Sequence, residues 1–172
     1  MRFAASVEYE GTNFFGWQRQ SSVNSIQEEI ENSISQITQS NIKIQGAGRT
    51  DAGVHALGQV FHFDTDIIRP INSLIKGVNS FLPDSIRIKW VKSVPDDFHA
   101  RFFATGREYQ YLLNNSSINS SIWSNHCGWT FYELDFTLLK NASKKFEGCH
   151  DFSAFRSSEC QAKSPIRLIE NI

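Results

Sequence analysis

The sequence predicts an α+β protein in which strands and helices alternate along the chain. Three observations support this prediction. Apolar residues alternate with other residues near 2–9, 42–44, 57–64 and 86–90, which is the period of a half-buried strand. Two further segments place apolar residues every three or four positions, as one face of a helix does. The resulting order, strand–helix–strand–strand–helix–strand, is the split βαβ or ferredoxin-like arrangement.

Both helices have recognisable starts. Ser25 can cap the first helix, and Glu28 completes a capping box three residues later. The second helix is expected to start near Pro70, which the first turn of a helix tolerates. The residues expected on the buried faces are, for the first helix, Ile26, Ile30, Ile34 and Ile37 and, for the second, Ile71, Leu74, Ile75 and Val78.

These elements define a first unit over residues 1–95, and residues 96–172 form a second one. In the second unit we expect a long extended run over 102–113, a helix over 136–146 with Gly148 as its C-cap, and a strand from Ile166. Because this order stops inside an apolar strand, we expect a chain truncated within its second unit.

Composition narrows the class of protein. The 172 residues carry 17 Lys+Arg and 18 Asp+Glu, a net charge of −1, which argues against a uniformly basic nucleic-acid coat protein and permits a local basic cleft. No apolar run reaches the roughly 20 residues that a membrane-spanning helix needs. Three cysteines without C-x-x-C spacing favour reduced thiols in a cytoplasm. The pairs His126–Cys127 and Cys149–His150 lack zinc-ribbon spacing, so we expect no metal site.

The richest candidate for chemistry is the glycine-rich segment over residues 46–55. A dinucleotide site would need a third glycine where Asp51 stands, and a P-loop would need a following Gly-Lys-Ser/Thr. The segment also leads into a strand rather than a helix, so no helix N-terminus is available for a phosphate. A carboxylate beside an arginine on a glycine-rich loop is what remains.

The residue types leave the roles in this loop open. Asp51 can serve as a nucleophile or a base, and Arg49 can bind phosphate or keep the carboxylate ionised. The alternative is an Asx-type turn with a surface arginine. Tyr109 presents an aromatic face that suits an unstacked base, and the alternative for it is a strand residue packed on the core.

The run Gly48–His55, followed by Gly58–Val60, resembles the signature of the TruA family of tRNA pseudouridine synthases. Further blocks of the resemblance lie in order along the chain: Tyr9–Gly11, Phe15–Gln20, Ser25–Glu28, Asn79 with Leu82–Pro83, Val94–Phe102, Arg107–Tyr111 and His150–Phe152. The resemblance implies two ferredoxin-like (RRM-like) subdomains around a mainly antiparallel sheet, the second of them incomplete here. It also implies a cytoplasmic homodimer that isomerises uridine to pseudouridine in the anticodon stem-loop of tRNA, at positions 38–40, without cofactor or metal.

By the same resemblance, Asp51 is the catalytic carboxylate, Arg49 helps to flip the target base out of its stack, and Tyr109 stacks on the uracil. From their charge, Arg107 and Arg19 are expected to line a groove that binds the RNA substrate, and the alternative for them is ordinary solvated charge. The basic residue that pairs with the catalytic aspartate in the family has no assignable position in this chain. The alternative expectation is therefore a truncated, non-catalytic remnant of the same fold that binds tRNA or forms dimers.

Overall fold

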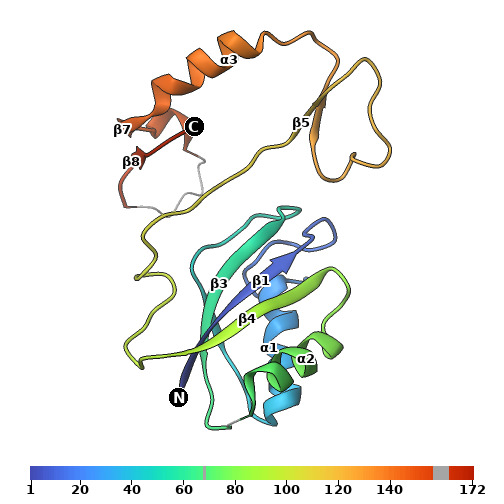
Figure 1. The fold of residues 1–172 in the computed structure, drawn as a ribbon, viewed down its shortest axis with the longest axis vertical. Coiled ribbons are helices and arrows are strands. Elements are labelled where there is room, and N and C mark those ends of the chain that lie inside the picture. Colours follow the sequence, from blue (N-terminus) through green and yellow to red (C-terminus); the bar gives the residue numbers. More distant parts are fainter. Residues whose placement is uncertain (68, 157–162) are drawn as a thin grey trace. The chain divides into compact units, whose positions relative to one another are not determined.

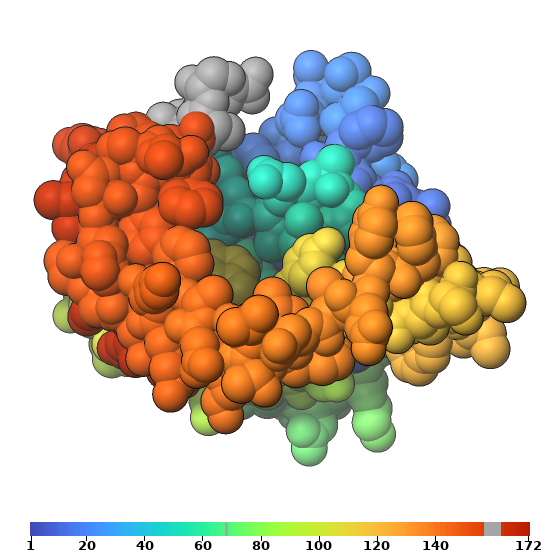
Figure 2. All heavy atoms as spheres, turned by 90° about the horizontal axis from the view of Figure 1, so that it is seen from above, coloured from blue at the N-terminus to red at the C-terminus, as the bar shows by residue number. Residues whose placement is uncertain are grey.

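The computed structural model describes residues 1–67, 69–156 and 163–172 (Figure 1). The chain divides into two compact units, Met1–Tyr109 and Gln110–Ile172, which we describe separately. In Figure 2 the same residues are drawn as spheres, with the first unit coloured from blue to yellow and the second from yellow to red. The subdomain boundary expected at residue 95 falls just after a strand, and residues 96–109 belong to the first compact unit.

The first unit is an antiparallel sheet with two helices on one face (Figure 1). The strand order is β2-β3-β1-β4, and each neighbouring pair is antiparallel. The six elements follow one another in the predicted order: β1 Arg2–Tyr9, α1 Ile26–Thr38, β2 Ile44–Gly46, β3 Ala56–Asp64, α2 Ile71–Phe81 and β4 Ile86–Val94. The expected α+β content and element order of residues 1–95 are therefore confirmed.

Helix α1 starts where the sequence places it. The Ser25 hydroxyl accepts a hydrogen bond from the Glu28 amide, whereas the Glu28 carboxylate reaches Arg19 at 3.2 Å. The buried core joins apolar side chains of α1 and α2 to those of the sheet. One expectation for α2 is wrong: Ile71 is 39% exposed, because it is the first residue of the helix and lies one turn before Leu74 enters the core.

Strand β4 departs from simple alternation. Ser6 pairs with Trp90 while Val7 pairs with Ile88, so Lys89 is an extra residue, a β-bulge in β4. The bulge shifts which side chains face the helices, and Val91 rather than Trp90 joins the core. The sequence pattern Ile86, Ile88, Trp90 predicted the opposite, since alternation alone does not reveal a bulge.

The segment after β4 is bound to the sheet by polar contacts. Arg2 pairs with Asp64 at 2.8 Å and donates to the Phe98 carbonyl at 2.9 Å. The Ala100 amide donates to Nδ1 of His62 at 3.2 Å, and both residues are buried. Burial lowers the pKa of His62, and the nearby charges of His99 and Arg2 lower it further, against a smaller opposing effect of Asp64.

The second unit contains short elements: β5 Leu113–Asn115 parallel to β6 Gly128–Thr130, α3 Phe136–Ser143, 3₁₀ turns at Lys144–Phe146 and Ser153–Phe155, and β7 Gly148–Asp151 antiparallel to β8 Ile166–Ile169. The strand expected over 102–113 is wrong, because pairing begins only at Leu113 and residues 104–111 form no ladder with any described strand. The helix ends at Ser143, and Gly148 (φ +100°) follows the 3₁₀ turn that extends it.

Across the described ranges, no helix combines the length and the apolar character that crossing a bilayer requires.

The contacts of His62 predict a pH-dependent attachment of the segment after β4. Because the folded state lowers the pKa of His62, protons bind preferentially to the unfolded state, and stability falls as pH drops below about 6.5. We expect the protection factor of the Ala100 amide to decrease between pH 7 and pH 5. In His62→Asn, whose Oδ1 can replace Nδ1 as the acceptor, this dependence should largely vanish. Equal pH dependence in both proteins would contradict the assignment.

Candidate active site

The glycine-rich loop over residues 47–55 connects β2 to β3, and its first residues are held by three hydrogen bonds. The Ala47 amide donates to the Val60 carbonyl at 2.7 Å, which extends the strand pairing into the loop. The Gln59 side-chain amide donates to the Gly48 carbonyl at 2.6 Å. Arg107 donates from Nη2 to the Ala47 carbonyl at 2.7 Å. The loop therefore leaves the sheet in a fixed direction.

Trp17 supports the loop from the core. Its side chain is only 2% exposed and packs between Tyr9 and Phe61 at ring distances of 6.0 and 6.3 Å. A Cβ on Gly46 would lie 2.8 Å from the indole ring, so the close approach of β2 depends on this glycine. Trp17 is thus a core residue that also donates its backbone amide to the loop, at the Thr50 carbonyl, over 3.0 Å.

Thr50, the residue before Asp51, is held through its carbonyl oxygen and its hydroxyl. Its carbonyl accepts the Trp17 amide, and its hydroxyl lies 2.9 Å from the buried Tyr9 hydroxyl. Gly16 makes this approach possible, because its φ is +88° and a Cβ there would lie 2.6 Å from the Thr50 carbonyl oxygen. The backbone on the N-terminal side of Asp51 is consequently fixed.

Asp51 begins a tight turn. The Val54 amide donates to the Asp51 carbonyl at 3.2 Å, and Gly53 has φ +78° at the third position, which is the pattern of a type II turn. The Gly53 amide in turn donates to the Phe14 carbonyl at 3.2 Å. The turn directs the Asp51 side chain outward, and its residue is exposed.

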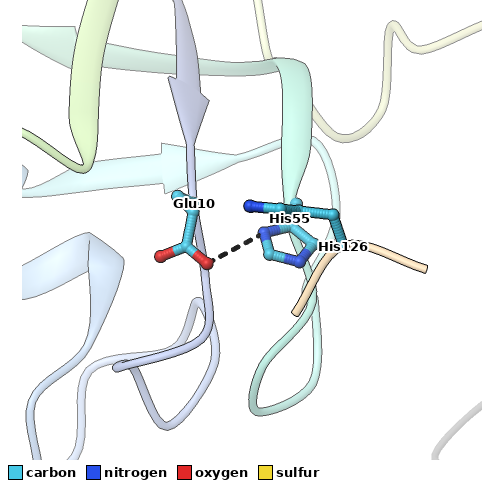
Figure 3. A group of neighbouring side chains, drawn as sticks. All are labelled: Glu10, His55 and His126. Atoms are coloured by element: carbon cyan, nitrogen blue, oxygen red, sulfur yellow. Dashed lines mark ion pairs between the residues drawn. The ribbon is translucent and has the colours of Figure 1, made fainter. Parts of the chain in front are cut away.

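The end of the loop is bound to the segment after β1, residues 10–25, which connects β1 to α1 (Figure 3). A Cβ on Gly11 would overlap the Val54 carbonyl, so the two backbones are in direct contact. The Gly11 amide donates to Nδ1 of His55 at 3.1 Å, and a Glu10 carboxylate oxygen lies 3.6 Å from the same nitrogen. Nδ1 of His55 is thus the acceptor of a backbone hydrogen bond from the segment after β1. His55 therefore fixes the loop end.

The Asp51 carboxylate is open to a ligand. In the portion of the chain that the structure describes, no side chain forms a hydrogen bond or an ion pair with it. Arg49, two residues earlier, is also exposed. An exposed carboxylate on a fixed backbone can act as a nucleophile or a base without first moving its loop.

Two of the other predicted site residues lie on the segment that follows β4. Arg107 contacts the loop directly, at the Ala47 carbonyl and beside Gly48, where a Cβ would meet its Nε at 3.2 Å. Tyr109 is 81% exposed and follows two residues later. Two residues of chain span at most about 7 Å, so the anchor at Arg107 limits how far the Tyr109 backbone lies from the loop.

Arg19 is placed elsewhere, against α1. Its guanidinium pairs with Glu31 at 2.9 Å and Glu28 at 3.2 Å, and no described contact joins it to residues 47–55. The buried Glu31 carboxylate also accepts hydrogen bonds from the Ile44 amide, Gln27 and Lys43. Burial by itself raises the pKa of Glu31, but these hydrogen bonds, the one from Arg19 first among them, outweigh it and lower the pKa below its usual value. The network attaches β2 to α1.

Sequence reasoning missed the residues that hold the loop. Tyr9 and Gln59 were each assigned to a strand and to a block of the resemblance, but to no role in the loop, although both make side-chain hydrogen bonds to it. The available signal was indirect: Gly11 and Gly16 flank an aromatic run in the segment after β1. Such glycines indicate close backbone approach, but they do not identify the segment that is approached.

Comparison with known proteins matches this chain to one family. The family model described as tRNA pseudouridine synthase matches residues 5–102. Proteins named tRNA pseudouridine synthase A are similar over the whole chain or nearly so: 47% identity over 172 residues in Pseudoalteromonas atlantica, 47% over 169 residues in Nitrosomonas eutropha, and 45% over 172 residues in Shewanella frigidimarina. These alignments cover 100%, 98% and 100% of this chain but 65%, 61% and 66% of the relatives. The chain thus spans slightly less than two thirds of the length of these relatives.

The glycine contacts predict a sharp difference between two substitutions. In Gly11→Ala the new methyl group would overlap the Val54 carbonyl, whereas in Gly58→Ala it would meet only the Ser6 hydroxyl at 3.6 Å. We expect Gly11→Ala to lower the free energy of unfolding by about 2 kcal/mol or more and Gly58→Ala to change it by less than about 0.5 kcal/mol. Urea unfolding followed through protection of the β1 amides would measure both. Similar losses in the two variants would contradict the contact.

The hydrogen bonds of Glu31 predict that Glu31→Ala and Arg19→Ala lower the stability of the protein by different amounts. Glu31→Ala leaves the buried Ile44 amide without its acceptor and should cost about 2–4 kcal/mol of stability. Arg19→Ala should cost much less than Glu31→Ala, since Gln27, Lys43 and the Ile44 amide still bind the carboxylate. Because the folded state lowers the Glu31 pKa, this contribution is present above about pH 4.5 and is lost as pH falls through the folded value. Unfolding measured at pH 7 and pH 3.5 tests both statements, and a loss in Glu31→Ala that is the same at both would overturn the second.

Proposed function

Because this chain belongs to the tRNA pseudouridine synthase family, we propose that it isomerises uridine to pseudouridine in tRNA, with Asp51 as its catalytic carboxylate. The observation that carries the proposal is the exposed Asp51 side chain on a loop whose backbone is fixed on both sides. The target we propose is the anticodon stem-loop, at positions 38–40, and the proposal extends to a homodimer as the working form.

Isomerisation needs a group that allows the N1–C1′ bond to break and a C5–C1′ bond to form. The Asp51 carboxylate would do this by attacking C6 of the uracil or C1′ of the ribose. The base turns before it is rejoined, C5 loses its proton and N1 ends with one. Atoms and electrons balance within the substrate, so the reaction consumes no oxidant, reductant or co-substrate.

The reaction requires the target nucleotide outside its stack. Arg49 lies two residues from Asp51 and is exposed, and its planar guanidinium suits a phosphate or the space that the flipped base leaves. Tyr109 exposes nearly all of its ring, which suits stacking on an unpaired uracil and removal of the C5 proton. Arg107, already beside the loop, would add positive charge near the RNA backbone.

We propose a smaller role in RNA binding for Arg19 than for Arg49 and Arg107. Its charge is balanced by Glu28 and Glu31, so we assign it to the edge of an RNA surface through its exposed part. The second candidate function is tRNA binding or dimer formation without turnover, and the observation that favours it is that, among the described residues, no basic side chain pairs with the Asp51 carboxylate.

Tritium release from tRNA labelled at uridine C5 tests the proposal. The 172-residue chain should release tritium, and Asp51→Asn should lower the rate at least about 10³-fold because it removes the nucleophile or base. Asp66→Asn, an exposed aspartate in another turn, is the matched control and should retain the rate. Binding of tRNA should be similar in all three proteins.

Two outcomes would contradict the proposal. Equal release by the Asp51→Asn variant and the unaltered chain would remove Asp51 from catalysis. Absence of release from the folded, tRNA-binding chain would favour the non-catalytic function instead.

A further inference from the structure

We propose that Tyr9 is a positioning residue for Asp51, acting through a hydrogen bond between its hydroxyl and that of Thr50. The inference rests on the proposed function, since it assigns Asp51 a chemical role. Tyr9 does not touch the substrate in this proposal. It fixes the residue that precedes the carboxylate.

The first step of the argument is the burial of Tyr9. The side chain is 2% exposed at the end of β1, packed against Trp17 at a ring distance of 6.0 Å. Packing of the ring would be served equally well by phenylalanine. A buried hydroxyl carries a desolvation cost unless it is hydrogen-bonded, so its presence points to its one described partner, Thr50, at 2.9 Å.

The second step is the position of Thr50. Its hydroxyl contacts Tyr9, its carbonyl accepts the Trp17 amide at 3.0 Å, and its carbonyl oxygen lies against Gly16. Tyr9 belongs to the sheet and Trp17 to the core, so both partners are anchored in the most buried part of the first unit. The position of the peptide that joins Thr50 to Asp51 is therefore fixed by contacts with the core and not by the surface loop.

The third step is the protonation state. Burial raises the pKa of Tyr9, and the hydrogen bond to Thr50 offsets only part of that effect. The phenol consequently keeps its proton throughout the neutral range, so the Tyr9–Thr50 contact does not change over that range. A positioning role should thus leave the pH profile unchanged.

Four variants separate this role from simple packing. Tyr9→Phe removes only the hydroxyl, Thr50→Val removes its partner, and Thr50→Ser keeps the partner. The double variant Tyr9→Phe/Thr50→Val tests whether both act through one contact. Tyr132→Phe, which removes a hydroxyl from an exposed tyrosine of the second unit, is the control.

The first readout needs no turnover. Hydrogen exchange of the Trp17 and Val54 amides, whose acceptors are the Thr50 and Asp51 carbonyls, reports on the backbone at either side of the carboxylate. We expect roughly 3- to 10-fold faster exchange of both amides in Tyr9→Phe and in Thr50→Val, with the amides of β1 unchanged. Thr50→Ser and Tyr132→Phe should differ less than twofold from the unaltered chain. Unchanged exchange in Tyr9→Phe would overturn the proposal.

The second readout is turnover in the tritium assay. Tyr9→Phe and Thr50→Val should lower kcat by about 10-fold with KM within twofold and the same pH profile, and the double variant should be no worse than either. A raised KM at constant kcat, or additive losses, would overturn the positioning role. If the unaltered chain shows no turnover, the proposed function fails, and the exchange readout still decides whether Tyr9 holds the loop.

Discussion

The rest of the site depends on one constraint, the direct contact between the segment after β1 and the loop between β2 and β3. Gly11 lies against the Val54 carbonyl and Gly16 against the Thr50 carbonyl, at distances that no Cβ would permit. Backbone amides of Trp17 and Gly53 bridge the same two segments. The backbone of the segment after β1 therefore packs directly against the loop that carries Asp51, and these contacts help to determine the conformation of the loop.

That contact is in turn anchored in the core. Trp17 fits over β2 because residue 46 is glycine, and Tyr9 ends the central strand of the sheet. On the other side of β2, Glu31 binds the Ile44 amide and so fixes the short edge strand from which the loop departs. In the proposed function, the Asp51 carboxylate must be held within about 0.5 Å of its reactive position, and the folded core would supply that positioning before a substrate binds.

The sequence predicts those features of the fold and the site that depend on local patterns, and it misses those that depend on distant contacts. Periodicity identified the elements of the first unit, and the Ser25 cap placed the start of α1, because both signals are local. The bulge at Lys89 and the unpaired run before Leu113 were missed, since register and pairing depend on a distant partner that alternation does not contain. Gly11 and Gly16 in the segment after β1 were visible as glycines, but the carbonyls that they face lie 43 and 34 positions away in the chain. For the same reason the loop's exposed residues were identified by resemblance, while the buried residues that hold them emerged only from contacts.

In the proposed function, the arrangement separates two requirements of a site that modifies a base, a fixed backbone and accessible side chains. The backbone around Asp51 is held by residues that are buried or half-buried, whereas Arg49, Asp51 and Tyr109 are exposed. Because the backbone is already rigid in the folded protein, the entropy cost of positioning the carboxylate is met during folding and does not reduce the free energy of substrate binding. Exposure of the side chains leaves them able to meet a nucleotide that must first leave its stack, because a buried carboxylate or ring would be inaccessible to it. Arg107 joins the two sets, since its guanidinium contacts the fixed loop at Ala47 while its backbone leads to the exposed Tyr109. In the proposed function, this one hydrogen bond from the Arg107 side chain would keep Tyr109 near the Asp51 carboxylate while leaving its ring free to stack on the base.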